Sequence, residues 1–235
     1  MAEQDPYLTL LCSLPGFDAL FAHRIPPLSR LRLDQRLLLL TDDDRSQLDA
    51  VEQILNWSRW PSGSDNAQAL QQIHALLNSL NEPRVKQLTE DILDLHAVQH
   101  ALHLRHTDKD YSRQPPATDW CISRFRSRLE QHWQDEDLGL GHYFLWLADA
   151  AEALKKQQLL AAEKIFFTSI WQHLLRQQPE DAFSFFAVVV YVLKWTLADR
   201  WSRTDGQQAR QRFQQLLAAH QTAPDGHTSA EELSA

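Results

Sequence analysis

Glycine is scarce in this chain, with 6 residues among 235. Sheet-rich folds with many tight turns need glycine, because several turn types require a positive φ angle that other residues rarely adopt. Leucine and glutamine are abundant, with 38 and 23 residues, and both are good helix formers. The composition therefore predicts an all-α protein.

Cysteine is scarcer still, with two residues, which excludes a small scaffold held by disulfide bonds. Cys12 and Cys121 form neither a CxxC pair nor a metal-binding spacing, so we interpret them as reduced thiols. Residues 1–6 are acidic and do not precede the apolar run of a secretory signal. We therefore expect a cytoplasmic protein.

An excess of basic residues is also absent. The chain has 31 acidic against 23 basic side chains, which gives a net charge of -8. Generic nucleic-acid binders need a basic surface that displaces counterions. We therefore expect no nucleic-acid partner.

The chain has no long hydrophobic run. Its most apolar segment, residues 182–193, is followed at once by Lys194, whereas a membrane-spanning helix needs about 20 apolar residues. This segment is typical of a helix that is buried on most sides. We expect membrane contact only through partner proteins.

Apolar residues at helical spacing predict helices along most of the chain. Ser29 is placed to cap a helix over 30–40, and Thr41 to cap one that runs to about residue 58, where three aspartates favour the helix dipole. Further helices are predicted at 67–80, 83–105, 120–134, 182–203 and 207–219, with a turn at 204–206 and either two helices or one kinked helix over 141–176.

The longest polar break is the predicted boundary between two lobes. It covers residues 107–119, contains Pro115 and Pro116, and separates a lobe at 1–106 from one at 120–220. Residues 221–235 are small and polar, which predicts a disordered tail. The fold prediction is an all-α multi-helix bundle, with two packed helical lobes as one arrangement.

The motifs of common active sites are missing. The sequence contains no GxxxxGK[ST], GxGxxG or GxSxG pattern, so the usual phosphate-binding loops and nucleophile elbows are absent. We therefore expect no catalytic residue and no cofactor.

One cluster of histidines resembles a metal site. His96, His100 and His103 share a face of the helix predicted at 83–105, and His106 follows. Zinc accepts imidazole ligands at such spacing, but one straight helix places three ligands at rising heights. The alternative is a polar flank of the helix, and we predict no metal ion there.

Isolated charges leave alternatives open. Arg124, Arg126 and Arg128 form either a site for phosphate or an acidic partner, or a solvated face. Lys194 interrupts the most apolar helix. It either pairs with a carboxylate, for which Glu163 is a candidate, or extends its ammonium group to the surface.

Eight tryptophans are many for this length. Each brings a large apolar area and one N–H that needs a hydrogen-bond partner. Most are expected in the core. Trp57, Trp60 and Trp201 lie near predicted helix ends, where an interface could use them.

Several segments together resemble a known family in residue type, order and spacing. They are Tyr7-Leu8 with Ser13-Leu14-Pro15, Pro26-Pro27-Leu28-Ser29, Asp42–Asp44, Leu160–Lys164, Trp171, Phe183-Ser184, Tyr191–Lys194 and Arg200-Trp201. The family is a group of bacterial proteins encoded with V-type (V/A-type) ATPases. They look like shortened relatives of the C-type subunit of that machine, whose eukaryotic counterpart is the d-type subunit. The resemblance covers about residues 7–217, with a weaker middle.

The resemblance implies an all-helical, non-enzymatic adaptor. The C-type subunit sits on the cytoplasmic face of the proteolipid ring and receives the foot of the central rotor axle. The implied partners are therefore central-stalk and proteolipid-ring subunits, and the implied location is peripheral to the inner membrane. The implied structural or interface residues are Glu163, Lys164, Trp171, Tyr191, Lys194, Arg200 and Trp201.

The chain departs from the family pattern at two positions. Phe167 stands where an acid is expected, and Ile170 where a basic residue is expected. Three hypotheses remain open: a stable adaptor of the ATPase, a transient assembly or regulatory factor of the same ATPase, and a metal-dependent enzyme that uses the histidine cluster.

Overall fold

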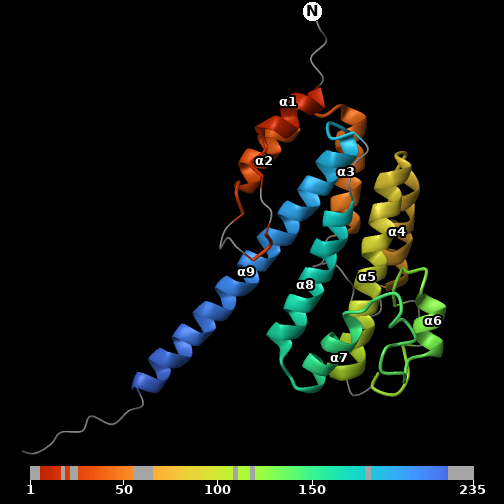
Figure 1. Ribbon diagram of the computed structural model, residues 1–235, viewed down its shortest axis with the longest axis vertical. Coiled ribbons are helices and arrows are strands. Elements are labelled where there is room, and N and C mark those ends of the chain that lie inside the picture. Colours follow the sequence, from red (N-terminus) through yellow and green to blue (C-terminus); the bar gives the residue numbers. More distant parts are fainter. Residues whose placement is uncertain are drawn as a thin grey trace, which may run out of the picture.

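The computed structural model describes residues 6–16, 19–21, 26–55, 66–107, 111–116, 120–177 and 181–221. Within these residues the chain forms nine α-helices and no strand, which confirms the all-α prediction (Figure 1). The helices are α1 (Pro6–Ser13), α2 (Arg30–Leu37), α3 (Asp42–Ile54), α4 (Asn66–Ser79), α5 (Pro83–Thr107), α6 (Arg126–Gln131), α7 (Leu147–Lys155), α8 (Leu159–Arg176) and α9 (Phe185–Gln221).

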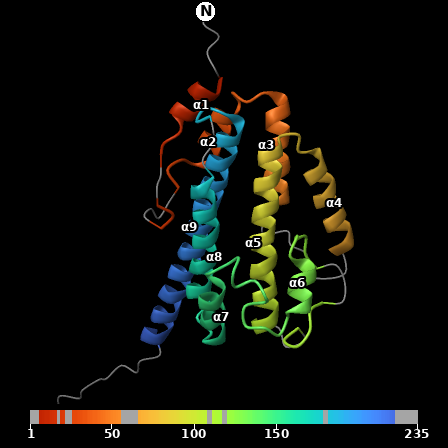
Figure 2. The ribbon, with the colours of Figure 1, turned by 45° about the vertical axis from the view of Figure 1, so that its right-hand side comes forward.

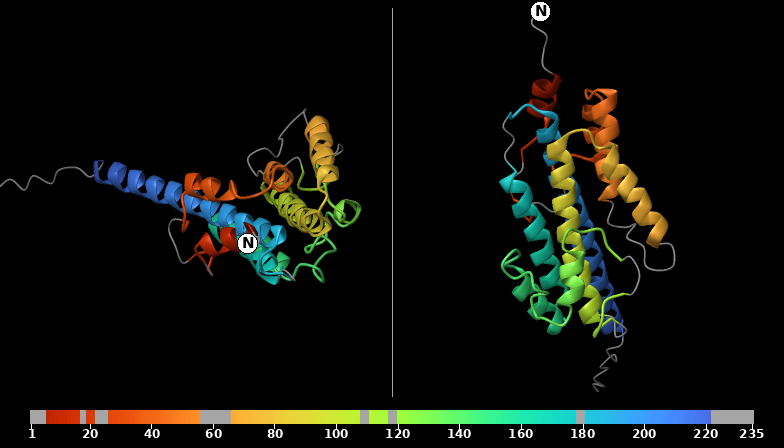
Figure 3. Two further views of the ribbon diagram at one scale, coloured as in Figure 1. Left: turned by 90° about the horizontal axis from the view of Figure 1, so that it is seen from above. Right: turned by 90° about the vertical axis from the view of Figure 1, so that its right-hand side faces the viewer.

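Helix α5 stands at the centre of the bundle. In Figure 2 it lies between the pair α8 and α9 on one side and helices α4 and α6 on the other. Helix α9 is the longest, with 37 residues. Its C-terminal end extends beyond the rest of the bundle, which Figure 3 shows from above. No helix in the described ranges is both long and apolar enough to span a bilayer.

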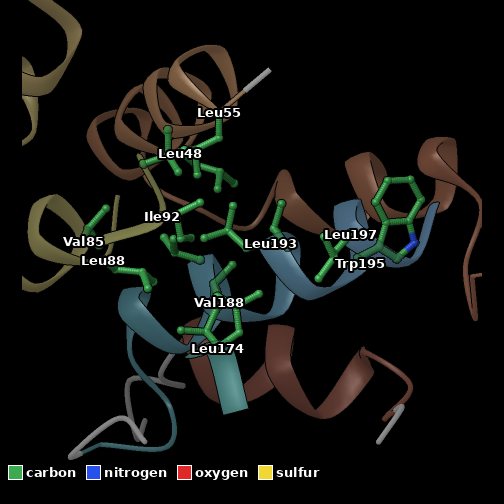
Figure 4. Packing of buried hydrophobic residues seen from close by; sticks show 14 of the residues in the cluster. Leu48, Leu55, Val85, Leu88, Ile92, Leu174, Val188, Leu193, Trp195 and Leu197 are labelled. Carbon is green, nitrogen blue, oxygen red and sulfur yellow. The ribbon is translucent and has the colours of Figure 1, made fainter. Parts of the chain in front are cut away.

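The larger group of buried side chains, which we call the leucine cluster, joins distant parts of the sequence. It contains buried residues between 10 and 95 together with residues between 167 and 201, most of them leucine and valine. Leu48 of α3 points toward Ile92 of α5 and Leu193 of α9 (Figure 4). Because these side chains are almost fully buried, each contributes about 1.5–3 kcal/mol to stability.

The second group, which we call the aromatic cluster, consists mostly of alanine and leucine around the rings of Trp120, Trp133 and Phe166. It joins the second half of α5 to residues 120–140, α7 and the start of α8. The rings of Trp120 and Trp133 meet edge to face with centroids 5.7 Å apart. Their indole N–H groups donate to Glu130 (3.2 Å) and to the carbonyl of Tyr111 (2.8 Å), so both buried donors are satisfied.

The two clusters meet within helices α5 and α8. Residues 85–95 of α5 belong to the leucine cluster and residues 97–102 to the aromatic cluster. Helix α8 changes cluster between Phe166 and Phe167. The boundary between the two clusters therefore crosses α5 and α8. The lobe boundary predicted at 107–119, of which the structure describes 107 and 111–116, stays a prediction.

Two predicted helix starts are confirmed. The Ser29 hydroxyl accepts the N–H of Arg32 at the start of α2. The Thr41 hydroxyl accepts the N–H of Asp44 (3.2 Å) at the start of α3, whose first turn holds three aspartates. Helix α2 ends at Leu37, three residues earlier than predicted.

The helix predicted at 120–134 is mostly wrong, because α6 covers only Arg126–Gln131. The carboxylate of Asp94 on α5 accepts the Ser123 hydroxyl (2.7 Å) and the Arg124 backbone N–H (2.9 Å). A distant side chain thus binds an N–H near the predicted start of this helix. Tertiary contacts override the local helical preference here.

The alternatives for residues 141–176 are resolved in favour of two helices, α7 and α8. The break lies at Gln157, whose φ is +57°. The N–H of Gln157 donates to Leu154 and that of Gln158 to Ala153, which is the Schellman pattern of a helix end. Glycine usually takes this left-handed position, so glutamine gave no signal in the sequence.

The turn predicted at 204–206 is wrong, because α9 continues through it to Gln221. The Thr204 hydroxyl donates back to the Arg200 carbonyl within the helix (3.2 Å). A single glycine such as Gly206 costs a helix only about 1 kcal/mol relative to alanine. The predicted tail at 221–235 lies outside the described residues except for Gln221.

Candidate functional site

Four residues at the contact between α8 and α9 form one cluster. The Lys164 ammonium lies 5.8 Å from the centre of the Trp201 ring, and the Arg200 guanidinium lies 5.6 Å from that of Phe167. The rings of Phe167 and Trp201 meet edge to face at 5.5 Å. The structure thus brings together three residues that the resemblance singled out, with cations over aromatic faces.

Trp201 is a core residue rather than an open interface residue. It is only 7% exposed, and Phe21 also packs edge to face against it at 4.8 Å. Trp57 and Trp60, the other tryptophans proposed for an interface, lie outside the described residues.

An ionisable group that is buried or half-buried accompanies this cluster on each of three helices: Glu163 on α8, Arg200 on α9 and His96 on α5. Burial raises the pKa of Glu163 on α8, and the positive charge of Arg200 on α9 opposes that rise. Burial, with a smaller effect of Arg200, holds the pKa of His96 on α5 well below its ordinary value. Arg200 is therefore the cation that acts on Glu163, whereas the Lys194 ammonium lies 5.7 Å from the centre of the Trp171 ring.

The two departures from the family pattern have a structural explanation. Phe167, at a position where the resemblance leads us to expect an acid, places its ring 5.6 Å from the Arg200 guanidinium in a cation–π contact. Ile170, which stands where a basic residue is expected, is 3% exposed in the leucine cluster. A charged side chain at that position would be buried among apolar residues, which would lower the stability of the fold.

Two aromatic side chains of α9 hold the N-terminal segments in place. The Tyr191 hydroxyl donates to the carbonyl of Pro15 (3.0 Å), and the indole N–H of Trp195 donates to the carbonyl of Leu28 (2.9 Å). Burial raises the pKa of Tyr191 to about 12, so it remains a donor at neutral pH. These bonds join segments more than 160 residues apart in the sequence.

The histidines of α5 pack against different aromatic neighbours. The His100 ring lies 5.9 Å from that of Trp120, and the His103 ring 5.4 Å from that of Phe166. Burial lowers the pKa of His100 to about 4 and also lowers the pKa of His103. In the part of the chain that the structure describes, no three His, Cys, Asp or Glu side chains are placed to hold a metal ion.

Arg124 belongs to an ion-pair network that sequence reasoning missed. Its guanidinium donates to Asp94 (2.7 Å) and Asp91 (2.5 Å) of α5, and Asp91 also faces His173 of α8 at 3.4 Å. Asp94 is buried, so these bonds fix the chain before α6 against α5. No local sequence pattern indicates this network, because Arg124 lies 30 residues from Asp94 and 33 from Asp91.

The other two arginines of the predicted basic cluster are also engaged within the chain. Arg126 pairs with Glu130 one turn later (2.9 Å), and Arg128 donates to the carbonyl of Gly139 (2.7 Å). All three arginines of the predicted basic cluster therefore have partners within the chain.

A groove of about 740 Å³ runs between α5 and α8, and we call it the α5–α8 groove. Its third wall is formed by residues 124–125 and 143–146 and by Asp149. Phe125 and Phe144 pack edge to face at 5.6 Å in this wall, and Lys164 connects the groove to the α8–α9 cluster. Its volume lies within the range of ligand-binding clefts.

No known family model, curated protein or solved structure matches this chain. The α8–α9 cluster and the α5–α8 groove both combine charged and aromatic side chains.

Proposed function

We propose that the chain is a non-catalytic adaptor of a V/A-type ATPase that links the central rotor axle to the membrane proteolipid ring, in the manner of the C-type subunit. The basis of the proposal is the ordered set of residues that resembles the family encoded with these ATPases. Such an adaptor requires binding surfaces and a body that transmits force.

One observation supports the proposal most strongly. The Tyr191 hydroxyl of α9 donates to the carbonyl of Pro15, and both residues lie in segments that carry the resemblance. The matched positions of α8 and α9 likewise join through Lys164 and Trp201.

The body of the protein suits the transmission of torque. Helices α5 and α8 each pass through both core clusters, so the two clusters cannot slide past one another without breaking a helix. Close-packed interiors have low compressibility. The bundle therefore provides a continuous connection between its two ends.

Exposed apolar residues mark two separate faces. Leu31 and Leu38, near α2, are 69% and 74% exposed, and Leu145, before α7, is 85% exposed. In Figure 1, α2 lies toward the upper end of the bundle and α7 toward its lower end. Apolar side chains gathered at the surface are typical of protein interfaces, and an adaptor between two partners needs two of them.

The experiment that tests this function is a pull-down of the tagged full chain from its native membranes in mild detergent, with quantified stoichiometry. The adaptor function predicts one copy per ATPase together with axle and ring subunits. Sub-stoichiometric recovery would favour a transient assembly or regulatory factor. A preparation without any component of the ATPase would overturn the proposal.

A further inference from the structure

A pocket of about 630 Å³ opens within the leucine cluster, and we call it the core pocket. Helices α2, α3, α5, α8 and α9 all contribute to its lining. Six lining side chains are leucine or isoleucine and at most 6% exposed: Leu55, Ile92, Ile170, Leu174, Leu193 and Leu197. In Figure 4, Leu55, Ile92 and Leu193 approach one another from the end of α3, from α5 and from α9. The volume is typical of ligand-binding clefts, and the apolar lining favours a hydrocarbon body.

One polar side chain of α9, Thr196, belongs to the same lining. Its hydroxyl is buried and has no hydrogen-bond partner among the described residues. The hydroxyls of Thr89, Thr168 and Thr204, by contrast, each donate to the backbone carbonyl four residues earlier in their own helix. Because a buried hydroxyl without a partner destabilises the fold, Thr196 marks a position in the core pocket where a hydrogen-bonding atom of a ligand is favoured.

The charged side chains of the lining are already paired. The Arg30 guanidinium donates to both carboxylate oxygens of Glu52 (2.5 and 2.8 Å) and to Asp34 (2.9 Å). Asp49 faces Arg45 at 3.6 Å. Arg30 and Asp49 are also partly exposed to solvent, with side-chain exposures of 43% and 50%. These groups form the polar rim of the pocket, and none of them needs a charged ligand as its partner.

The signs of the lining charges disfavour an ionic ligand. The lining holds one positive side chain, Arg30, and two negative ones, Asp49 and Glu52. An anionic ligand would therefore meet a net negative lining, and a cationic ligand would meet Arg30 and lose its hydration among leucines. A neutral ligand avoids both penalties.

We infer that the core pocket binds a small neutral aliphatic molecule that carries one oxygen atom, of the chemical class of alcohols and ketones. Its hydrocarbon part contacts the six buried leucine and isoleucine side chains, and its oxygen accepts the hydrogen bond of the Thr196 hydroxyl. The inference goes beyond the adaptor function and does not depend on it, because it rests on the pocket alone.

The direct test compares three probes of equal chain length: octanol, octylamine and octanoate. Binding of each probe to the full-length protein is measured by isothermal titration calorimetry at neutral pH. Octanol should bind saturably, and the two charged probes should bind at least about tenfold more weakly. Nuclear Overhauser contacts between octanol and the labelled methyl groups of Ile92 and Ile170 should locate the probe in the core pocket.

Variants of Thr196 test the hydrogen bond. Thr196→Val keeps the shape of the side chain and removes its hydroxyl, so octanol should bind about fivefold more weakly. The free protein should lose no stability, because the removed hydroxyl has no partner among the described residues. Thr196→Ser retains a hydroxyl and should bind octanol within about twofold of the unaltered chain. Thr168→Val is the matched control, because Thr168 does not line the core pocket, and it should bind octanol as the unaltered chain does.

Four results would overturn the inference. Octanol does not bind, its contacts map to methyl groups outside the core pocket, either charged probe binds as tightly as octanol, or Thr196→Val binds octanol as tightly as Thr168→Val. A water molecule on Thr196 together with no binding of octanol would assign the hydroxyl to hydration alone and would also overturn it. None of these results depends on co-purification with the ATPase, so the core pocket and the adaptor function can fail separately.

Discussion

The leucine cluster and the aromatic cluster are stabilised in different ways. The leucine cluster is formed by side chains from helices that are far apart in sequence, and burial of leucine and valine supplies its stability. The aromatic cluster contains many alanines, which bury less area, and its surroundings are rich in hydrogen bonds from charged side chains. Apolar burial is thus the main source of stability in the leucine cluster. Around the aromatic cluster, charged side chains that hydrogen-bond to the backbone add to it, and we call these side chains polar anchors.

The polar anchors act on the backbone of the turns near the aromatic cluster. Arg105 of α5 donates to the carbonyls of Trp133 (3.0 Å) and Glu136 (3.1 Å). Asp137 accepts the backbone N–H groups of Gly139 (2.9 Å) and Gly141 (3.2 Å). Residues 132–146, which form turns rather than helix, are thus fixed by bonds that a helix would have supplied internally.

The largest effect is expected from a charge in the leucine cluster. Val189→Asp places a carboxylate at a fully buried position of α9, which should lower the free energy of unfolding by about 4–5 kcal/mol. Urea unfolding followed by circular dichroism measures the loss. Leu145→Asp, at an exposed position, should change stability by only about 0.5 kcal/mol. A Val189→Asp variant as stable as the unaltered chain would refute burial as the stabilising force.

Removal of a polar anchor should cost less but act locally. Asp94→Ala leaves the Ser123 hydroxyl and the Arg124 N–H without their acceptor, and we expect a loss of about 3 kcal/mol. Hydrogen exchange should rise first at residues 123–125. Asp91→Ala, which removes a more exposed carboxylate, is the matched control and should cost less. Equal effects of the two variants would contradict the anchoring role of Asp94.

Acid should weaken the aromatic region. His100 has a pKa of about 4 in the folded protein because of burial, below the ordinary value of about 6.5. The unfolded chain therefore binds the proton more readily, and stability is lost as the pH falls from about 6.5 toward 4. Between pH 7 and pH 5 this histidine contributes a loss of about 2 kcal/mol.

The variant His100→Gln isolates this contribution. Its unfolding free energy should depend less steeply on pH over the same interval than that of the unaltered chain, as measured by urea unfolding at each pH. An unchanged slope would show that other groups cause the acid sensitivity.

The smallest effect is expected where the clusters meet, at Glu163. Its pKa is raised by burial, so the folded state is penalised as the pH rises through that value and the carboxylate becomes charged. Glu163→Gln should therefore raise the melting temperature slightly at pH 7.5 and leave it unchanged at pH 4. Glu152→Gln, which removes an exposed partner of Lys156, should give no gain. A loss of stability in Glu163→Gln would show that its charge supports the fold.

Local signals in the sequence predicted the helices of the leucine cluster well. Ser29 and Thr41 cap helices through bonds to residues three positions later, so the information is contained in the adjacent sequence. Segment 120–134 was mispredicted because Asp94, about thirty residues away, determines its backbone. The break at Gln157 was ambiguous because glutamine rarely occupies the left-handed region.

The candidate site was predicted in part. Lys164, Arg200 and Trp201 were identified from the resemblance, and the structure brings them together with Phe167. The α5–α8 groove was not predicted. Its wall comes from turns such as 143–146, where no periodic pattern indicates which side chains are exposed.

The proposed position of this chain between axle and ring is tested most directly by a cryo-EM map of the ATPase, isolated through a tag on this chain. We predict one copy on the rotor axis, with one face against the axle foot and another against the cytoplasmic side of the proteolipid ring. Density for the chain on a peripheral stalk, or none on the rotor axis, would contradict the adaptor function.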